Sequence, residues 1–424
     1  MQKKKITMVI AGLGGRGHDI YGNYAIEHPD EVEIVAIADP RKERLEVAQK
    51  EWNIPAHLCF STAEELFAMP QMAQAAVIAT QDRQHVAHAE AALKAGYHLL
   101  LEKPVAIDTK GCLEVLRMAR EYKRHVVVCH VLRYTPFYNT IKQFIEAGRI
   151  GEVVTIQAME QVGYWHHAHS YVRGNWRRAD QSSPMILAKC CHDMDILLWL
   201  AGKRARWVSS YGSNYLFQEA HAPEGSAERC FDCAVRKTCP YDAVRYYLEG
   251  ERTSVKAGRV HWPINVLSPN PTSETIEHAL RTGPYGRCVY HCDNDVVDHQ
   301  VVNMQLEDGV TVNFTMSAFT ERCYRTIKVM GTHGCIEGNM DDSHLVWNDF
   351  FGHREEIDLK VTDGSMAGHG GGDAVMMKQF AELLASGRDD EMLSSIEHSI
   401  ESHMVALLAE ESRLQNGCSL PVNL

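Results

Sequence analysis

The sequence lacks long apolar runs, an excess of basic residues and any repeated or low-complexity segment. No apolar stretch in its 424 residues approaches the roughly 20 that a membrane-spanning helix needs. The formal net charge is −12, with acidic residues spread along the chain, which disfavours nucleic acid or an anionic membrane as a partner. Hydrophobic residues make up 45% and charged residues 23%, as is typical of a globular protein with two or three domains.

The amino-terminal residues also lack the pattern of an export signal. The basic start MQKKK leads into an apolar segment that is too short for a signal peptide and runs into glycines, so we expect a first β-strand there. Thirteen cysteines in a chain of this length do not suggest a disulfide scaffold. We therefore expect reduced thiols and a cytoplasmic location.

Residues 1–130 alternate strand-like apolar runs with helical patterns. The runs KITMVIAGLG, VEIVAIADP, AQAAVIAT, YHLLLEKP and HVVVCHVLR predict five strands. Strands separated by helices of this length predict a parallel sheet built from βαβ units, and hence the α/β class.

A glycine-rich segment after the first run has the pattern of a dinucleotide-binding turn. It reads Gly12-Leu13-Gly14-Gly15-Arg16-Gly17, follows a predicted strand and precedes a predicted helix. Glycines there allow a tight turn and the close approach of a pyrophosphate, and the helix N-terminus offers free N–H groups. The alternative is a plain structural turn.

The second run ends in a carboxylate that supports the dinucleotide reading. Asp39 lies 22 residues after Gly17, where an acidic side chain bonds the ribose hydroxyls of NAD and repels the 2′-phosphate of NADP. Arg41 would instead accept that phosphate. The sequence therefore predicts NAD as the cofactor, with NADP as the alternative.

The fourth run ends abruptly in Glu102, Lys103 and Pro104. Ligands of an open parallel sheet bind outside the carboxyl ends of the strands. We therefore expect Lys103 to lie beside the cofactor, the alternative being a solvated lysine paired with Glu102.

Together these segments resemble the Gfo/Idh/MocA oxidoreductases, which include glucose–fructose oxidoreductase and inositol dehydrogenases. AGLGGRG, ADPRKER, VIATQDRQHVAHAEAALKAGYHLLLEKPVA, HVLRYTPFY and AGRIGEVVTI carry the resemblance, which is strongest over residues 5–160. It implies that Lys103 binds substrate and assists proton transfer near the nicotinamide. It also implies that the block around Thr80 and His85 covers the nicotinamide ribose, with Glu102 beside the cofactor.

The resemblance further implies two domains. Residues 1–130 would form an NAD-binding Rossmann domain. Residues 131–424 would form an α/β domain with a large, mostly antiparallel sheet for substrate binding and oligomer contacts, giving a dimer or tetramer.

The segment ILAKCCHDMDILLWLAG predicts one helix with His192 and Asp195 on one face. The family shows D-x-G-x-H here, and His192 matches its catalytic histidine. Ala188 stands where the family has Asp and Cys190 where it has Gly, so a carboxylate is missing. Lys189, Cys191, Asp193 or Asp195 could compensate; the alternative for His192 is a core or capping role.

Other polar and aromatic residues are candidates for a polyol pocket, since aromatic rings stack on sugar faces and polar groups bond hydroxyls. They are Arg133, Tyr134, Tyr164, His166, His167, His169, Arg173, Asp195 and His369. A surface loop explains most of them equally well, and Asp373 near His369 is expected to cap a helix.

An insert at about residues 213–296 carries clustered cysteines. The spacings Cys230-x2-Cys233-x5-Cys239 and Cys288-x3-Cys292 predict a structural zinc ion held by the first three and one of the later pair. An iron–sulfur cluster and plain packing of thiols are the alternatives.

Three functions fit these patterns. The first is NAD-dependent oxidation of a secondary hydroxyl on a sugar, sugar derivative or cyclic polyol. The second is a glycoside hydrolase or lyase that uses NAD transiently. The third is a non-catalytic NAD-binding sensor, which the position of Lys103 disfavours.

Overall fold

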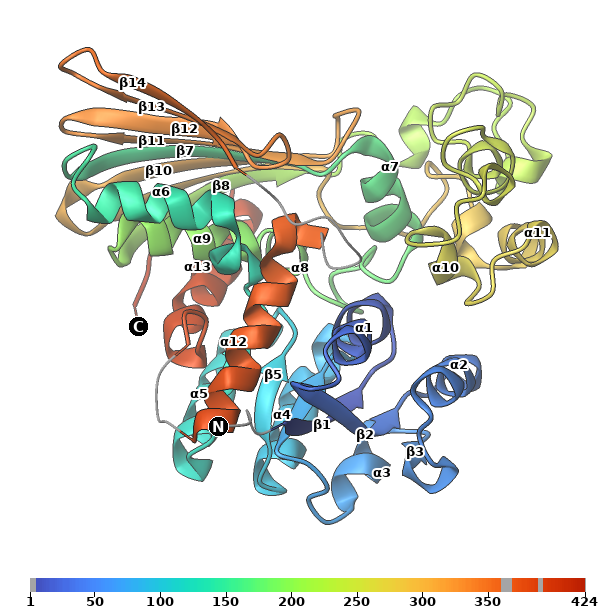
Figure 1. The fold of residues 1–424 in the computed structure, drawn as a ribbon. Helices are drawn as coiled ribbons and strands as arrows, with labels where there is room; N and C mark the ends of the chain where they lie inside the picture. Colours follow the sequence, from blue (N-terminus) through green and yellow to red (C-terminus); the bar gives the residue numbers. More distant parts are fainter. Residues whose placement is uncertain (1–4, 360–367, 388–391, 424) are drawn as a thin grey trace.

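A computed structural model describes residues 5–359, 368–387 and 392–423 (Figure 1). The amino-terminal part contains a six-stranded parallel sheet with the order β3-β2-β1-β4-β5-β6. Its strands are β1 Ile6–Ala11, β2 Val32–Ala38, β3 Cys59–Phe60, β4 Ala75–Ile78, β5 His98–Leu101 and β6 Val126–Val128. The five predicted strands are confirmed. The sequence missed β3, because two residues form no apolar run.

Helices cover both faces of this sheet, so its strands are buried on both sides. They are α1 Asn23–Glu27, α2 Lys42–Trp52, α3 Ala63–Ala68, α4 His85–Lys94 and α5 Thr109–Tyr122, with a wide helical turn at Gly15–Gly22 before α1. The chain runs outward in one direction from β1 to β3 and in the other from β4 to β6. The strand order therefore reverses between β1 and β4, which is where open α/β sheets bind their ligands.

The second sheet has nine strands in the order β14-β13-β12-β11-β7-β10-β9-β8-β15, and only the β7–β10 pair is parallel among the described pairings. Its strands are β7 Val153–Gln161, β8 Ala205–Ser213, β9 His299–Leu306, β10 Thr311–Ser317, β11 Tyr324–Gly331, β12 Gly334–Asn339, β13 His344–Asp349, β14 Arg354–Asp358 and β15 Leu420–Pro421. The mostly antiparallel sheet that the resemblance implied is confirmed.

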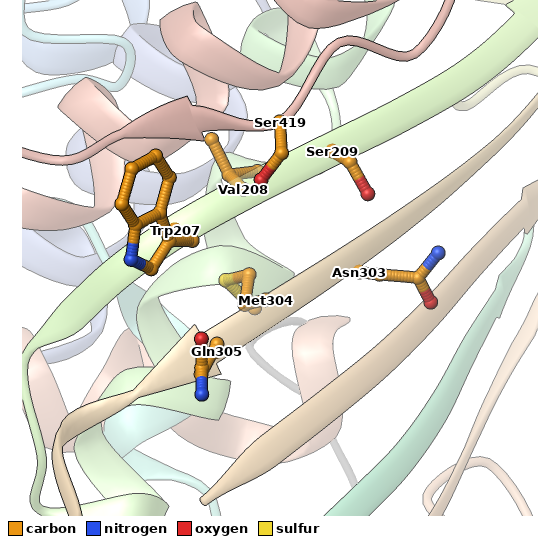
Figure 2. Close-up of a pocket in the computed structure, with 7 residues that line it drawn as sticks. All are labelled: Trp207, Val208, Ser209, Asn303, Met304, Gln305 and Ser419. Atoms are coloured by element: carbon orange, nitrogen blue, oxygen red, sulfur yellow. The ribbon is translucent and has the colours of Figure 1, made fainter. Parts of the chain in front are cut away.

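Helices cover one face of the nine-stranded sheet (Figure 1). They are α6 Pro136–Glu146, α9 Cys191–Ala201 and α13 Ile396–Leu414. Along β8 and β9, Val208, Val302 and Met304 point to this buried face, whereas Trp207 and Gln305 point to the opposite, uncovered face. Figure 2 shows a depression on these strands, lined in part by Trp207, Ser209, Asn303 and Gln305.

Two carboxy-terminal helices join the two sheets. Methionine and phenylalanine side chains of α12, Gly372–Ser386, belong to the apolar core beside β1. The α13 helix packs on α5 as well as on β8, and His403 on it accepts a hydrogen bond from the Val105 N–H at 2.9 Å. These helices fix the carboxyl end of β5 against the second sheet.

The predicted insert folds as short helices and turns with a small core of its own, which includes Tyr247, Ile264 and Leu280. Its helices are α10 Ile264–Leu267 and α11 Ser273–Thr282. The Asn265 side chain donates to Asp19 Oδ2 at 2.9 Å, so the insert contacts the helical turn that follows the glycines. In the described ranges, every helix is too short or too polar to cross a lipid bilayer.

Candidate active site

The glycine turn is closed by contacts that exclude larger side chains. Gly12 has a φ of +94°, and a Cβ atom there would lie 2.3 Å from the Ala79 carbonyl oxygen. A Cβ atom on Gly17 would lie 1.8 Å from the Gly12 oxygen. The main chain therefore approaches β4 closely enough that only glycine fits.

Asp39 fastens this turn to the end of β2. Its carboxylate accepts a hydrogen bond from the Leu13 N–H at 2.7 Å and from the Arg41 N–H at 2.8 Å. Arg44 Nη1 lies 3.8 Å from Asp39 Oδ2 and 3.6 Å from the place of a Cβ on Gly14. Arg44 therefore lies beside the turn, and although it is part of ADPRKER the motif gave no reason to single it out.

Lys103 lies where the fourth predicted strand ends, at the carboxyl edge of the parallel sheet. Its Nζ donates to the Ala188 carbonyl oxygen at 2.8 Å. The predicted single helix around Ala188 is wrong, because the structure has α8 at Met185–Ala188 and α9 from Cys191. Since α8 ends at Ala188, the carbonyl of that residue is available to the lysine.

Glu102 does not pair with the Lys103 ammonium. It accepts hydrogen bonds from Arg16 Nε at 2.5 Å and from the Tyr21 hydroxyl at 2.5 Å. Burial alone would raise the pKa of Glu102, but the charges of Arg16 and Lys103 lower it. The carboxylate is therefore ionised and holds the guanidinium of the glycine turn against the end of β5.

The same guanidinium reaches a second buried carboxylate, Asp373 on α12. Arg16 Nη2 donates to Asp373 Oδ1 at 2.6 Å, and His369 Nδ1 lies 3.0 Å from Asp373 Oδ2. Burial alone would raise the pKa of Asp373, but Arg16 and His369 hold it well below its ordinary value. The predicted capping role of Asp373 is wrong, because its side chain makes these contacts and the helix has no side-chain cap.

His192 lies beside His369 and His130 in this arrangement. Its ring centroid is 5.9 Å from that of His369 and 5.8 Å from that of His130. Burial, and after it the charge of Lys103, lowers the pKa of His192 well below its ordinary value. His192 is therefore a neutral imidazole, and its Nδ1 is buried with no hydrogen-bond partner in the described structure.

The candidates proposed to replace the missing carboxylate are occupied elsewhere. Asp193 accepts hydrogen bonds from Arg325, and Lys189 lies 3.4 Å from Glu160. Burial raises the pKa of the Cys191 thiol to about 12, so it stays protonated. Asp195 accepts two hydrogen bonds from Arg133.

Arg133 and Asp195 form a buried pair with Nε–Oδ2 and Nη2–Oδ1 distances of 2.6 and 2.7 Å. Arg133 also donates to the carbonyls of Leu393 and His398. The Tyr134 hydroxyl lies 2.9 Å from Ser394 Oγ. Arg133 and Asp195 therefore bind each other, and Arg133 and Tyr134 bind the loop before α13. Their polar atoms are used within the protein and do not line a substrate pocket in the described structure.

The aromatic-basic stretch divides between two environments. His166 lies 4.9 Å from the Trp262 ring and 3.5 Å from the Cys323 sulfur, and Tyr164 packs edge-on against Tyr241 at 5.9 Å. Burial, followed by Lys189, lowers the pKa of His166. The others lie in the interior: His167, His169 and Arg173 are all buried.

The loop after β4 is fixed to the turn of Lys103. The ring nitrogens of His85 lie 2.6 Å from the Pro104 oxygen and 3.1 Å from the Thr80 oxygen. Thr80 Oγ1 lies 2.9 Å from His88 Nδ1. His85 therefore positions this loop beside the end of β5 rather than presenting its own ring to a ligand.

The cysteines of the insert converge but do not form a metal site. Cys230, Cys233, Cys239 and Cys288 line one small cavity with Arg173, whose guanidinium lies 3.7 Å from the Cys230 sulfur. Across the described residues, however, the structure holds no group of three or more His, Cys, Asp or Glu side chains able to bind a metal ion.

The predicted zinc ion and the alternative iron–sulfur cluster are therefore not supported. Burial raises the pKa of the Cys288 thiol to about 11, and the Cys292 thiol donates to the Cys288 carbonyl at 3.1 Å. Both observations describe protonated sulfur packed among apolar and aromatic neighbours, which was the third reading of these cysteines.

Comparison with known proteins agrees with this architecture. Residues 6–130 match the model of an oxidoreductase family with an NAD-binding Rossmann fold, and residues 142–422 match the model of the family's C-terminal alpha/beta domain. The oxidoreductase YteT of Bacillus subtilis is 22% identical over 391 residues, which cover 88% of this chain and 87% of YteT. An inositol 2-dehydrogenase of Corynebacterium glutamicum is 26% identical over 202 residues, 47% of this chain and 56% of that enzyme.

Solved structures share the fold over the whole chain. An oxidoreductase from Agrobacterium radiobacter in complex with NAD+, L-tartaric acid and magnesium superposes with a TM-score of 0.69 at 15% identity, covering 99% of each chain. The apo scyllo-inositol dehydrogenase from Lactobacillus casei superposes with a TM-score of 0.67 at 16% identity, covering 100% of this chain and 99% of that one. With both of its family models matched in order along the sequence, this chain belongs to the Gfo/Idh/MocA oxidoreductase family.

Proposed function

We propose that this protein oxidises a secondary hydroxyl of a sugar, sugar derivative or cyclic polyol, with NAD as the hydride acceptor. The observation that carries the proposal is the position of Lys103. It lies at the carboxyl edge of the parallel sheet and donates a hydrogen bond to the Ala188 carbonyl, and its charge adds to the burial that lowers the pKa of His192. Relatives named as inositol dehydrogenases support the polyol class.

The residues of the glycine turn fit a dinucleotide. Gly12 and Gly17 allow the tight turn, Gly14 and Gly15 leave the main chain open to a pyrophosphate, and Asp39 would lie beside the adenosine ribose. When bound, the nicotinamide supplies the hydride acceptor. NADP is the alternative, because Arg41 and Arg44 could contact its 2′-phosphate. The Arg16 side chain is bonded to Glu102 and holds the turn in place.

Lys103 and His192 are the residues that we place at the reacting carbon. The lysine ammonium donates hydrogen bonds, so it would bind and polarise the hydroxyl oxygen while Ala188 holds its position. The neutral His192 would contact the same hydroxyl from α9. Among the aromatic candidates, Tyr164 and His166 remain as contacts to the rest of the sugar.

A second candidate is an NAD-dependent glycoside hydrolase or lyase. Ala188 leaves the site without the family carboxylate, and this departure favours altered chemistry. Incubation with NAD and a panel of free polyols, sugars and glycosides tests both. Accumulating NADH supports the dehydrogenase, whereas glycoside cleavage without net NADH supports the second candidate. If neither NADH accumulation nor glycoside cleavage is detected, the result supports the non-catalytic sensor.

We further propose a homo-oligomer, a dimer or tetramer, in the cytoplasm. The uncovered face of the nine-stranded sheet carries large apolar side chains, including Trp207 with 43% and Tyr211 with 56% of its surface exposed. All thirteen cysteines are free in the structure, which suits a reducing compartment. Light scattering after size exclusion would measure the mass, and a monomer would contradict the assembly.

A further inference from the structure

We propose that His369, held by Asp373, is the catalytic base that accepts the substrate hydroxyl proton. The proposal rests on the proposed function and assigns one of its steps to a residue outside the family motif. Ala188 stands where the family has a carboxylate. The proposal identifies Asp373 as the carboxylate that serves the site instead.

The contact between His369 and Asp373 fixes the imidazole in one useful form. Nδ1 lies 3.0 Å from Asp373 Oδ2, and because an ionised carboxylate only accepts, Nδ1 carries the proton. Nε2 is then the unprotonated nitrogen and can accept a proton. The second carboxylate oxygen is held by Arg16 at 2.6 Å, so Asp373 cannot turn away.

The placement of His369 also suits contact with a substrate. The side chain is 35% exposed, whereas Asp373 beneath it is fully buried. Its ring lies 5.9 Å from that of His192, which is within the electrostatic reach of Lys103. The exposed imidazole of His369 therefore lies beside the region in which we propose that the substrate hydroxyl binds.

The backbone at His369 is held in an uncommon conformation. His369 has a φ of +50° and is followed by two glycines that also have positive φ values, at the start of α12. Left-handed conformations at residues other than glycine cost free energy and concentrate at functional sites. Here that conformation, together with the Asp373 contact, sets the direction of the imidazole.

His192 is a poorer base than His369. It is only 4% exposed, has no carboxylate partner among the described residues, and feels the positive charge of Lys103, so its protonated form is disfavoured. A proton on His369 would instead lie next to the negative charge of Asp373. We therefore assign hydrogen bonding to His192 and proton transfer to His369.

The step balances with the partners already named. The substrate O–H bond breaks and its proton bonds to His369 Nε2. The carbinol C–H bond breaks and its electron pair leaves as hydride to the oxidised dinucleotide. The products are the ketone, the reduced dinucleotide and an imidazolium that returns its proton to solvent.

The first test compares His369→Asn with a matched control. His353 forms a similar contact, with Nδ1 2.7 Å from Asp349, but lies on the surface of the second sheet with 72% of its side chain exposed. We expect His369→Asn to lower kcat by ~10²–10⁴-fold while the NAD dissociation constant stays within about twofold. His353→Asn should match the parent. If the parent enzyme turns over and His369→Asn keeps its kcat within about threefold, the proposal is wrong.

The second test does not depend on turnover. Nitrogen-15 NMR of histidine-labelled protein with NAD bound would identify the His369 signals by their loss in His369→Asn. We expect the neutral imidazole in the Nδ1–H form with Nε2 unprotonated, because Nδ1 lies 3.0 Å from Asp373 Oδ2. Finding the Nε2–H form would overturn the base assignment. A parent protein that oxidises no polyol yet shows the Nδ1–H form would instead contradict the proposed function.

Discussion

The Nζ atom of Lys103 lies 2.8 Å from the carbonyl oxygen of Ala188 and donates a hydrogen bond to it. The D-x-G-x-H pattern of the family has a carboxylate side chain at the position of Ala188. In this protein the main-chain carbonyl of Ala188 accepts the hydrogen bond from the lysine instead. A neutral carbonyl orients an ammonium group without neutralising it. Burial, and after it the charge of Lys103, disfavours a second proton on His192.

Lys103→Met should abolish most turnover and leave NAD binding intact. The ammonium would act on the substrate, whereas the glycine turn and Asp39 would hold the dinucleotide. Loss of a group that assists proton transfer typically costs ~10²–10⁴-fold in rate. Steady-state kinetics and a fluorescence titration with NADH measure the two properties separately. A rate within about threefold of the parent would remove Lys103 from the mechanism.

We expect NAD to bind more tightly than NADP, because an Asp39 carboxylate beside the ribose would repel a 2′-phosphate. Arg44, at 3.8 Å from Asp39, opposes this preference. Arg44→Ala should therefore weaken NADP binding more than NAD binding. Titration of parent and variant with both dinucleotides measures the ratio. Tighter NADP binding by the parent would show that the arginines dominate.

Gly12→Ala should abolish dinucleotide binding or prevent folding. Its Cβ would lie 2.3 Å from the Ala79 oxygen, so either the turn or β4 must shift. Gly148 is a matched control, because it too has a positive φ of +70° but nothing lies within 4 Å of its added Cβ. Gly148→Ala should lose only the stability that strain at this φ costs, about 1 kcal/mol or slightly more. Equal NAD affinity in both variants would refute the close-contact argument.

Arg16→Met should destabilise the fold, because Glu102 and Asp373 would lose their shared cation. Leaving a buried charge without its partner costs ~3–5 kcal/mol. In the parent both carboxyl pKa values are lowered, so that stabilisation is present above the ordinary carboxyl pKa and is lost as the pH falls through the folded-state values.

Without Arg16, burial would raise both pKa values, and the carboxyls would take up protons as the pH falls from 7. The difference in unfolding free energy between parent and variant should therefore narrow towards pH 4.5. Urea unfolding at several pH values measures it. A constant difference would mean that the loss comes from packing rather than charge.

The sequence by itself determined most of the parallel sheet. Five of its strands are buried apolar runs, and the helical segments between them provide the crossovers that parallel strands need. The sequence also determined the position of Lys103, since the end of a parallel strand is an edge of the sheet wherever the strand lies. The hairpin turn between β9 and β10 is also local, because an Asp-Gly pair favours the positive φ values of 56° and 77° that Asp308 and Gly309 adopt.

Only the tertiary structure decided which charges meet. Arg16 and Asp373 are 357 positions apart, and their contact depends on α12 packing back onto β1. No local pattern distinguishes a helix cap from this pairing, so the role expected for Asp373 was wrong. The cysteine spacings likewise predicted a metal site, but spacing fixes only how close sulfurs can come, and the fold of the insert sets the distances between them.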